Sequence, residues 1–271
     1  MRDEECIRFL QWALPRLDLA WPGFRKVHGQ VCKRLKRRMR GLGIASVADY
    51  CARLAADPEE WQVLDGCCRI TISRFWRDRH TFEALGHVVL PKIAMRAAAE
   101  KREARLWSAG CASGEEPYTL KILWDLAVRP RFPDARVGIV ATDIDASLLD
   151  RARQACYLAT SLRELPPELA AHAFTEDNGC RCLRPAHRQG IQFLQQDVRQ
   201  EAPPGRFDLV LCRNLAFTYF APALQEAVLE RIAASLEPHG VLVIGSHEHL
   251  PGAMARWRPL GNYPTLFVLV S

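Results

Sequence analysis

The sequence lacks long hydrophobic runs, and this absence excludes a class of protein. None of its 271 residues belongs to an apolar stretch approaching the ~20 residues of a membrane-spanning helix. The chain begins MRDEECIRFLQW, which is acidic and has no extended apolar centre, unlike a secretory leader. The hydrophobic fraction of 49% is nevertheless enough to bury a core. We therefore expect a cytoplasmic protein with no segment inserted in a membrane.

Cysteine spacings typical of metal-binding fingers are also missing. Cys180 and Cys182, with His172 and His187 nearby, match no common zinc pattern, and we predict no metal site. The chain has ten cysteines, and several occupy apolar positions of helical or strand patterns: Cys6, Cys32, Cys51, Cys156 and Cys212. This placement favours reduced, buried thiols over a disulfide scaffold.

Acidic residues are absent from residues 25 to 40, although the whole chain has 31 Asp and Glu against 37 Lys and Arg. That stretch accounts for the net charge of +6, so the rest of the chain is close to neutral. Its cations are Arg25, Lys26, Lys33, Arg34, Lys36, Arg37, Arg38 and Arg40. Such a patch is either a solvated face or a surface for an acidic partner.

Residues 1–70 have helical patterns and no strand pattern. An apolar stripe recurs at helical spacing opposite the basic face, at Val27, Val31, Leu35, Met39 and Leu42. We predict a basic helical N-terminal domain over 1–70, followed by a linker helix within 71–104.

From residue 105 the pattern changes to strands alternating with helices. Strands are predicted at 105–109, 137–142, 191–194, 207–212, 241–245 and 266–270, and helices at 116–126, 146–155 and 222–236. Continuous apolar strands separated by helices are typical of a parallel sheet buried on both faces. We therefore expect a Rossmann-like α/β domain over 105–271, with a polar, β-type insertion at about 157–190.

Small residues and two acids follow the first predicted strand, in the segment SAGCASGEEPY at 108–118. Small residues including Gly110 allow a tight turn and close approach to a ligand. The segment is not the dinucleotide fingerprint G-x-G-x-x-G, and its acids, including Glu116, would repel a pyrophosphate. They suit a cationic group instead, such as the amino group of a methionine moiety.

Polar side chains also follow the next three strands. Asp143 ends the second strand, where such folds bind ribose hydroxyls, and Asp145 is better placed to cap the following helix. Asp197 with Val198 follows the third strand, and Asn214 with Leu215 follows the fourth. A ribose acid without a phosphate loop indicates S-adenosylmethionine (SAM) rather than NAD.

At these residues the sequence resembles the chemotaxis receptor methyltransferase (CheR) family, which methylates protein glutamates. The resemblance covers nearly the whole chain, in order, through KRLKRRMRGLGI, DYCARL, TISRFWRDRHTFEAL, WSAGCASGEEPYTL, ATDIDASLLDRAR, CRNLAFTYF and GSHEHL. It implies a class I methyltransferase sheet with helices on both faces, preceded by a small all-α domain.

The resemblance also implies roles for individual residues. Arg77 would face the methionine carboxylate, with Thr71 and Ser73 lining the same pocket. The remaining contacts to SAM, or to its product S-adenosylhomocysteine (SAH), would come from Gly110, Glu116, Asp143, Asp197, Val198, Asn214 and Leu215. Lys33, Arg34, Arg37 and Arg38, on the basic helix, would face the helical bundle of a receptor.

The sequence departs from the family pattern at several positions. Thr71 and Ser73 replace the usual Asn and Thr, and Asp197 replaces an Asn. The segment CRNLAFTYF is one residue longer than usual, so the substrate-side tyrosine is either Tyr219 or, without an insertion, replaced by Thr218. These departures affect the methyl acceptor more than the cofactor.

Methyl transfer to a glutamate needs positioning more than a base, because a carboxyl with a reference pKa of ~4.3 is already ionised at neutral pH. We predict that Arg77 and Tyr219 orient cofactor and acceptor, and that His247 is structural. Two other functions stay open: methylation of a different protein, peptide or small molecule, and a catalytically silent SAM-binding adaptor. We do not expect a nucleic acid partner, because the basic helix lacks interleaved aromatics.

Overall fold

The computed structural model describes residues 2–252 and 256–270 and divides the chain into two compact units. The helical unit consists of Met1–Thr71 and Thr218–Gln225, and the sheet unit of Ile72–Phe217 and Glu226–Ser271. Within the described residues, no helix is long and apolar enough to cross a membrane.

Short helices build the helical unit, and two of them, α4 and α5, begin at a capping side chain. The elements of the unit are α1 (Asp3–Ala13), the 3-10 turn η1 (Leu14–Leu17), α2 (Trp21–Phe24), α3 (His28–Gly41), α4 (Val47–Ala56) and α5 (Pro58–Cys68). The Ser46 side chain accepts the Asp49 N–H at the start of α4, and Asp57 caps α5 one residue before Pro58. On α3 the predicted apolar stripe is confirmed, because Val31, Leu35 and Met39 are buried.

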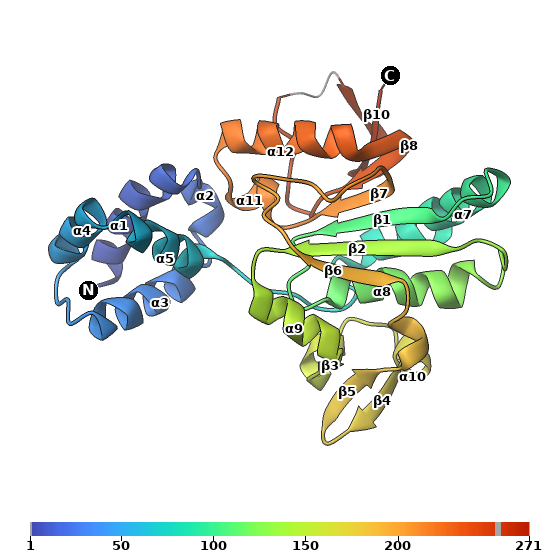
Figure 1. Cartoon of the computed structure of the whole chain (residues 1–271), viewed down its shortest axis with the longest axis horizontal. Helices are drawn as coiled ribbons and strands as arrows, with labels where there is room; N and C mark the ends of the chain where they lie inside the picture. The colour runs from blue at the N-terminus through green and yellow to red at the C-terminus, as the bar shows by residue number, and fades with distance from the viewer. Residues whose placement is uncertain (1, 253–255, 271) are drawn as a thin grey trace. The chain divides into compact units, whose positions relative to one another are not determined.

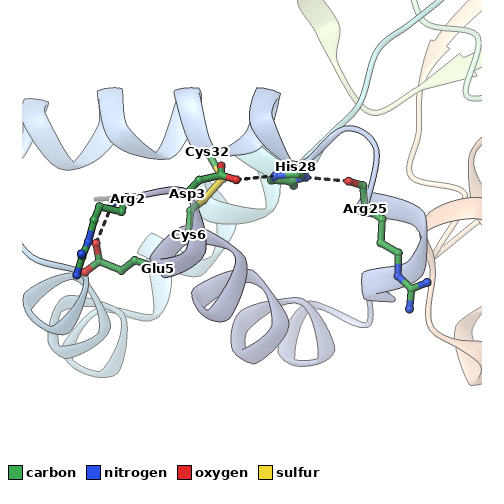
Figure 2. Close-up of a disulfide and its surroundings, with 7 residues drawn as sticks. All are labelled: Arg2, Asp3, Glu5, Cys6, Arg25, His28 and Cys32. Atoms are coloured by element: carbon green, nitrogen blue, oxygen red, sulfur yellow. Dashed lines mark hydrogen bonds and ion pairs between the residues drawn. A yellow bond between two sulfur atoms is a disulfide. The ribbon is translucent and has the colours of Figure 1, made fainter.

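A disulfide between Cys6 and Cys32 joins α1 to α3 (Figure 2). Beside it, His28 lies between the carboxylate of Asp3, at 3.4 Å, and the carbonyl oxygen of Arg25, at 2.8 Å (Figure 2). The prediction that these cysteines are reduced thiols is wrong in this structure. Apolar spacing correctly placed both sulfurs inside the unit, but it carried no information on whether two buried cysteines face each other.

The sheet unit is built on seven strands in the order β6-β2-β1-β7-β8-β10-β9 (Figure 1). The strands are β1 (Ala104–Ala109), β2 (Val137–Asp143), β6 (Ile191–Gln195), β7 (Phe207–Cys212), β8 (Leu236–Val243), β9 (Trp257–Leu260) and β10 (Tyr263–Leu269). The first five are parallel. The expected α/β, Rossmann-like fold is therefore confirmed.

The far edge of this sheet differs from the prediction. β10 runs antiparallel to β8 and to β9, and β9 has no counterpart among the predicted strands. Two antiparallel strands need only a short turn, here at Gly261 with φ +59°, whereas parallel neighbours need a crossover helix. A short apolar run does not reveal this difference in direction.

Helices cover both faces of the sheet. The linker helix runs as α6 (Arg79–Ala84), a π-helical turn η2 (Leu85–Val89) and α7 (Leu90–Ala99). It packs with α8 (Glu115–Leu123) on Leu106, Ile139 and Leu209 of the sheet. α9 (Ala146–Gln154) lies on the same side as α8, and α12 (Pro222–Ser235) on the other (Figure 1).

The predicted insertion forms a small sheet of its own, between α9 and β6. Its strands β3 (Cys156–Tyr157), β4 (Phe174–Asp177) and β5 (Cys180–Leu183) are antiparallel in the order β3-β5-β4, and α10 (Pro167–Ala173) precedes β4. A second disulfide joins Cys156 to Cys182, which are directly opposite in the register. Cys156 and Cys182 are thus a further correction to the expected free thiols.

Candidate functional site

The carboxyl ends of the parallel strands meet at one edge of the sheet unit, where folds of this kind bind ligands. Most of the predicted site residues come directly after β1, β2, β6 and β7 at this edge. The others belong to the linker or to the helical unit. The hydrogen bonds at the edge show which of them are held together.

A tight loop between β1 and α8 brings bare backbone to this edge. Gly110 and Gly114 have φ values of +74° and +91°, a region that favours glycine. A Cβ on Gly110 would overlap the side chain of Leu215. On Gly114 it would lie 2.8 Å from the Cβ of Ala152. Glycine is therefore required on both sides of the loop, because neighbouring side chains fill the space that a Cβ would need.

Asp143, at the end of β2, is tied to that loop. One of its carboxylate oxygens accepts the backbone N–H of Ala112 at 2.8 Å, and the other accepts that of Asp145 at 3.0 Å. The predicted capping role of Asp145 is confirmed, because its side chain accepts the N–H of Ser147 at 2.9 Å at the start of α9. The two acids thus have different tasks although they are two residues apart.

Glu116, in the first turn of α8, belongs to a buried polar network. Its carboxylate accepts hydrogen bonds from Ser108 Oγ at 2.7 Å and from the Arg213 guanidinium at 2.8 Å. Arg213 also donates to Asp78 at 2.8 Å, and its side chain is 3% exposed. Burial alone would raise the pKa of Asp78, but the charge and hydrogen bond of Arg213 outweigh it and hold that pKa below its ordinary value. The network joins the side chain of Glu116 to the buried guanidinium of Arg213.

The segment before the linker helix has an unusual backbone. Trp76 and Asp78, on either side of Arg77, have φ values of +60° and +66°, a strained region for residues with a Cβ. Arg213 holds this bend by donating to the carbonyl oxygen of Arg77 at 2.6 Å. The half-buried Arg77 side chain donates to the carbonyl oxygen of Ile72 at 2.6 Å.

The other two residues predicted in this segment lie earlier in the chain. Ser73 is half-buried in the sheet unit, whereas Thr71 is exposed and ends the first segment of the helical unit.

Asp197 and Val198 follow β6. The carboxylate of Asp197 is held by the backbone N–H of Arg199 at 2.9 Å and by its guanidinium. Val198 is buried, and its carbonyl oxygen accepts a hydrogen bond from Arg231 at 3.0 Å. These contacts fix the turn after β6.

Asn214 and Leu215 follow β7, and both backbone N–H groups point at one buried carboxylate. It belongs to Glu248, whose oxygens accept them at 2.8 and 3.1 Å. Sequence reasoning singled out His247 in this segment, but the His247 side chain is exposed and Glu248 is the buried one. Glu248 lies between His247 and His249 in the segment GSHEHL, so no local apolar pattern marked it as buried.

Tyr219 and Thr218 belong to the helical unit. The ring of Tyr219 lies 5.1 Å from that of Phe24, and its carbonyl oxygen accepts the N–H of Ala20 at 2.8 Å. A Cβ on Gly23 would overlap the carbonyl oxygen of Thr218. The segment at 218–225 is thus packed closely against the turn that contains α2.

The basic residues of α3 fall into two groups. Arg38 makes two hydrogen bonds, at 3.0 and 2.6 Å, to the carboxylate of Glu60, which is 1% exposed. Arg34 donates to the carbonyl oxygens of Cys67 and Arg69 at the end of α5. The exposed group comprises Lys33, Lys36, Arg37 and Arg40, which helical spacing places on one face.

No group of three or more His, Cys, Asp or Glu side chains is arranged to hold a metal ion in the part of the chain that the structure describes. Cys182, which the sequence placed beside Cys180 in a conceivable zinc pattern, is joined to Cys156 instead. Cys111 and Cys212 lie buried near the strand ends, and burial raises the pKa of both thiols. Neither is a reactive thiolate at neutral pH.

Comparison with known families identifies the domain to which this edge belongs. The model of the CheR methyltransferase SAM-binding domain matches residues 71–263. The chain belongs to the CheR methyltransferase family. The model of the CheR all-alpha domain matches residues 28–64, within the helical unit.

Named relatives extend over most of this CheR-family chain. Chemotaxis protein methyltransferase 2 of Pseudomonas aeruginosa is 33% identical over 239 residues, which is 86% of this chain and 82% of that protein. The chemotaxis protein methyltransferase of Salmonella typhimurium is 31% identical over 227 residues, 81% and 75% of the two chains. This protein is therefore a SAM-dependent methyltransferase.

The strand-end edge fits SAM chemically. Glu116, in the first turn of α8, is an acid suited to an ammonium group. The Asp143 carboxylate is oriented by two backbone N–H groups at the end of β2, the position at which folds of this kind bind ribose hydroxyls.

Proposed function

We propose that this protein methylates glutamate carboxylates of a protein partner, of the type found in chemoreceptor helical bundles. The observation that carries the proposal is the extent of the similarity. Relatives named as chemotaxis protein methyltransferases align over both units, so the all-α domain accompanies the SAM-binding domain. We further propose that the protein acts in the cytoplasm.

We propose the following division of the cofactor between the strand ends. Asp143 binds the ribose, and Glu116 the amino group, with its charge balanced by Arg213. Arg77 meets the methionine carboxylate, and Gly110 brings backbone close to the ligand. The adenosine end is bounded by Asp197, Val198, Asn214 and Leu215, and Thr71 with Ser73 completes the pocket. The hydrogen bonds of Asp143 to the loop after β1 and of Glu116 to Arg213 support this division most directly.

The proposed chemistry requires positioning rather than proton transfer. Bound SAM supplies a methyl group, whose transfer to a carboxylate oxygen breaks the sulfonium S–C bond and leaves neutral SAH. A glutamate acceptor is already ionised at neutral pH, so no side chain has to remove a proton. Arg77 and Tyr219 are proposed to orient cofactor and acceptor. The exposed side chain of His247 has no role as a base in this scheme.

The proposed partner surface is the exposed basic face of α3, formed by Lys33, Lys36, Arg37 and Arg40. Four cations on one helical face favour an acidic partner such as a helical bundle rich in glutamate. Arg34 and Arg38, which the sequence also suggested, hold α3 against α5 and contribute to the surface only through that packing.

The test uses the full chain with SAM and the purified cytoplasmic fragment of a chemoreceptor. Tandem mass spectrometry is expected to find a methyl ester on glutamate side chains of the fragment, released by mild base. Methylation of another residue type, or of a small molecule alone, would contradict the proposal and favour a diverged acceptor. SAH binding without transfer to any receptor fragment would favour a silent adaptor.

A further inference from the structure

Glu248 lies just beyond β8, at the same edge as the cofactor residues, and it is 5% exposed. Its carboxylate accepts backbone N–H groups from Gly245 at 2.7 Å, Asn214 at 2.8 Å and Leu215 at 3.1 Å. Hydrogen bonds to an ionised acceptor are about twice as strong as neutral ones. One side chain therefore ties the end of β8 to the turn after β7.

The turn that Glu248 holds has a backbone that needs holding. Asn214 has a φ of +54°, in the left-handed region that a residue with a Cβ adopts at a cost. Gly245 leaves just enough room for it, because a Cβ there would lie 2.8 Å from Asn214 Oδ1 and 2.9 Å from Glu248 Oε2. The three residues are thus fitted to one another. Enlarging Gly245 or neutralising Glu248 is therefore expected to displace the turn.

The turn after β7 contacts the loop between β1 and α8, which contains Gly110 and Gly114, through the side chain of Leu215. Its side chain occupies the space that a Cβ on Gly110 would need. Backbone held by Glu248 therefore sets where the Leu215 side chain lies against the loop after β1. Both segments belong to the cofactor edge, one of them on the adenosine side.

We propose that Glu248 is a positioning residue for the adenosine end of the cofactor. It acts by fixing the backbone of Asn214 and Leu215 and does not itself contact the ligand. The inference rests on the proposed cofactor site, and it adds Glu248, to which the sequence analysis assigned no role. In this proposal Glu248 positions the residues at the adenosine side of the edge, and Glu116 with Arg213 forms the side that binds the amino-acid end of the cofactor.

Calorimetry with two ligands tests this separation. SAH has both ends of the cofactor, whereas 5′-methylthioadenosine lacks the amino-acid end. Glu248→Gln replaces one acceptor oxygen by an NH2 group that faces N–H donors, and it is expected to weaken both ligands by the same factor, about tenfold. Glu116→Gln is expected to weaken SAH and leave 5′-methylthioadenosine unchanged. The two variants are therefore distinguished by their effect on 5′-methylthioadenosine, which only Glu248→Gln is expected to weaken.

The matched control is Glu230→Gln, which makes the same change at an exposed residue paired with Arg256. It is expected to bind both ligands as the wild type does. The proposal is overturned if Glu248→Gln binds both ligands with wild-type affinity, or if it loses affinity for SAH alone. If the wild-type protein binds neither ligand, both the proposed cofactor site and the role of Glu248 are overturned. If Asp143→Ala weakens ligand binding and Glu248→Gln does not, only the role of Glu248 is overturned.

A second variant covers the case in which Glu248→Gln does not fold. Gly245→Ala keeps the carboxylate but inserts a methyl group between it and Asn214. This variant is expected to weaken both ligands equally. A folded Gly245→Ala protein with wild-type affinity for 5′-methylthioadenosine overturns the proposal.

Discussion

The carboxylate of Asp143 lies 2.8 Å from the backbone nitrogen of Ala112 and accepts its hydrogen bond. This contact ties the end of β2 to the glycine loop after β1. The acid proposed to bind ribose therefore also holds the loop between β1 and α8. Ala112 itself has a φ of +47°, a strained conformation that such a bond helps to maintain.

Replacing Arg213 by Met is expected to destabilise the protein by about 3–5 kcal/mol, because Glu116 and Asp78 lose a buried partner. Arg213→Lys is expected to recover only part of this, since a lysine does not reproduce the forked geometry. Urea unfolding measures both free energies. The matched control, Arg256→Met, breaks an exposed pair with Glu230 and is expected to cost at most about 1 kcal/mol. Equal losses at Arg213 and Arg256 would contradict the described network.

The two groups of cations on α3 are expected to respond differently to substitution. Lys36→Glu with Arg37→Glu reverses charge on the exposed face, and should raise KM for a receptor fragment by about tenfold or more while leaving SAH affinity unchanged. The effect should shrink as salt is added, because exposed charges are screened. Methylation that is independent of both the substitution and salt would rule out this surface.

Arg38→Met is expected to act on folding instead. It leaves the buried carboxylate of Glu60 without its bidentate partner, which should destabilise the helical unit by about 3–5 kcal/mol. Thermal unfolding with Arg37→Met as the matched control measures the difference. If the two variants melt alike, Arg38 does not have the structural role that its contacts indicate.

The disulfides predict a redox dependence of stability. Each pair closes a loop with a sequence separation of 26 residues, for which about 3 kcal/mol of stabilisation is typical. Without reductant, intact mass and peptide mapping should find Cys6 joined to Cys32, and Cys6→Ser should unfold at lower urea (Figure 2). Cys51→Ser, at a free thiol, should not. Equal unfolding of both variants under non-reducing conditions would contradict the pairing.

Asp208 should control stability at low pH. Burial alone would raise its pKa, but hydrogen bonds from Arg102, from the Arg105 backbone and from Arg96 together hold the pKa below the ordinary value. An acid whose pKa is lower in the folded than in the unfolded state stabilises the fold at pH values above its unfolded pKa of ~3.9. It loses that contribution as the pH falls through the pKa of the folded state. Asp208→Asn should therefore be less stable than wild type near neutral pH, with a difference that shrinks below about pH 4. A constant difference across this range would contradict the assignment.

Much of the cofactor edge was predictable from the sequence. Continuous apolar runs located β1, β2, β6 and β7, and parallel strands place their carboxyl ends at one edge. The residues directly after those strands, such as Asp143, follow from that rule without further information. The cap role of Asp145 also followed, because it depends on a local signal.

The rest depends on contacts between segments distant in sequence. Glu248 is recognised only once the segment after β8 is seen beside Asn214, 34 residues earlier. Arg38 belongs to the fold rather than to the exposed face because α5 brings Glu60 to it. The pairing of Cys6 with Cys32 and the antiparallel direction of β10 likewise depend on packing that no local pattern encodes.

Titration of SAH into wild type, Asp143→Ala and Asp145→Ala tests the central claim most directly. Asp143→Ala removes the carboxylate that holds the glycine loop, and should weaken binding at least about tenfold. Asp145→Ala keeps the backbone N–H donated to Asp143, and should lose about 1 kcal/mol of stability through its cap with unchanged affinity. Wild-type affinity in Asp143→Ala, or no binding by folded wild-type protein, would contradict a SAM site at the carboxyl edge of this sheet.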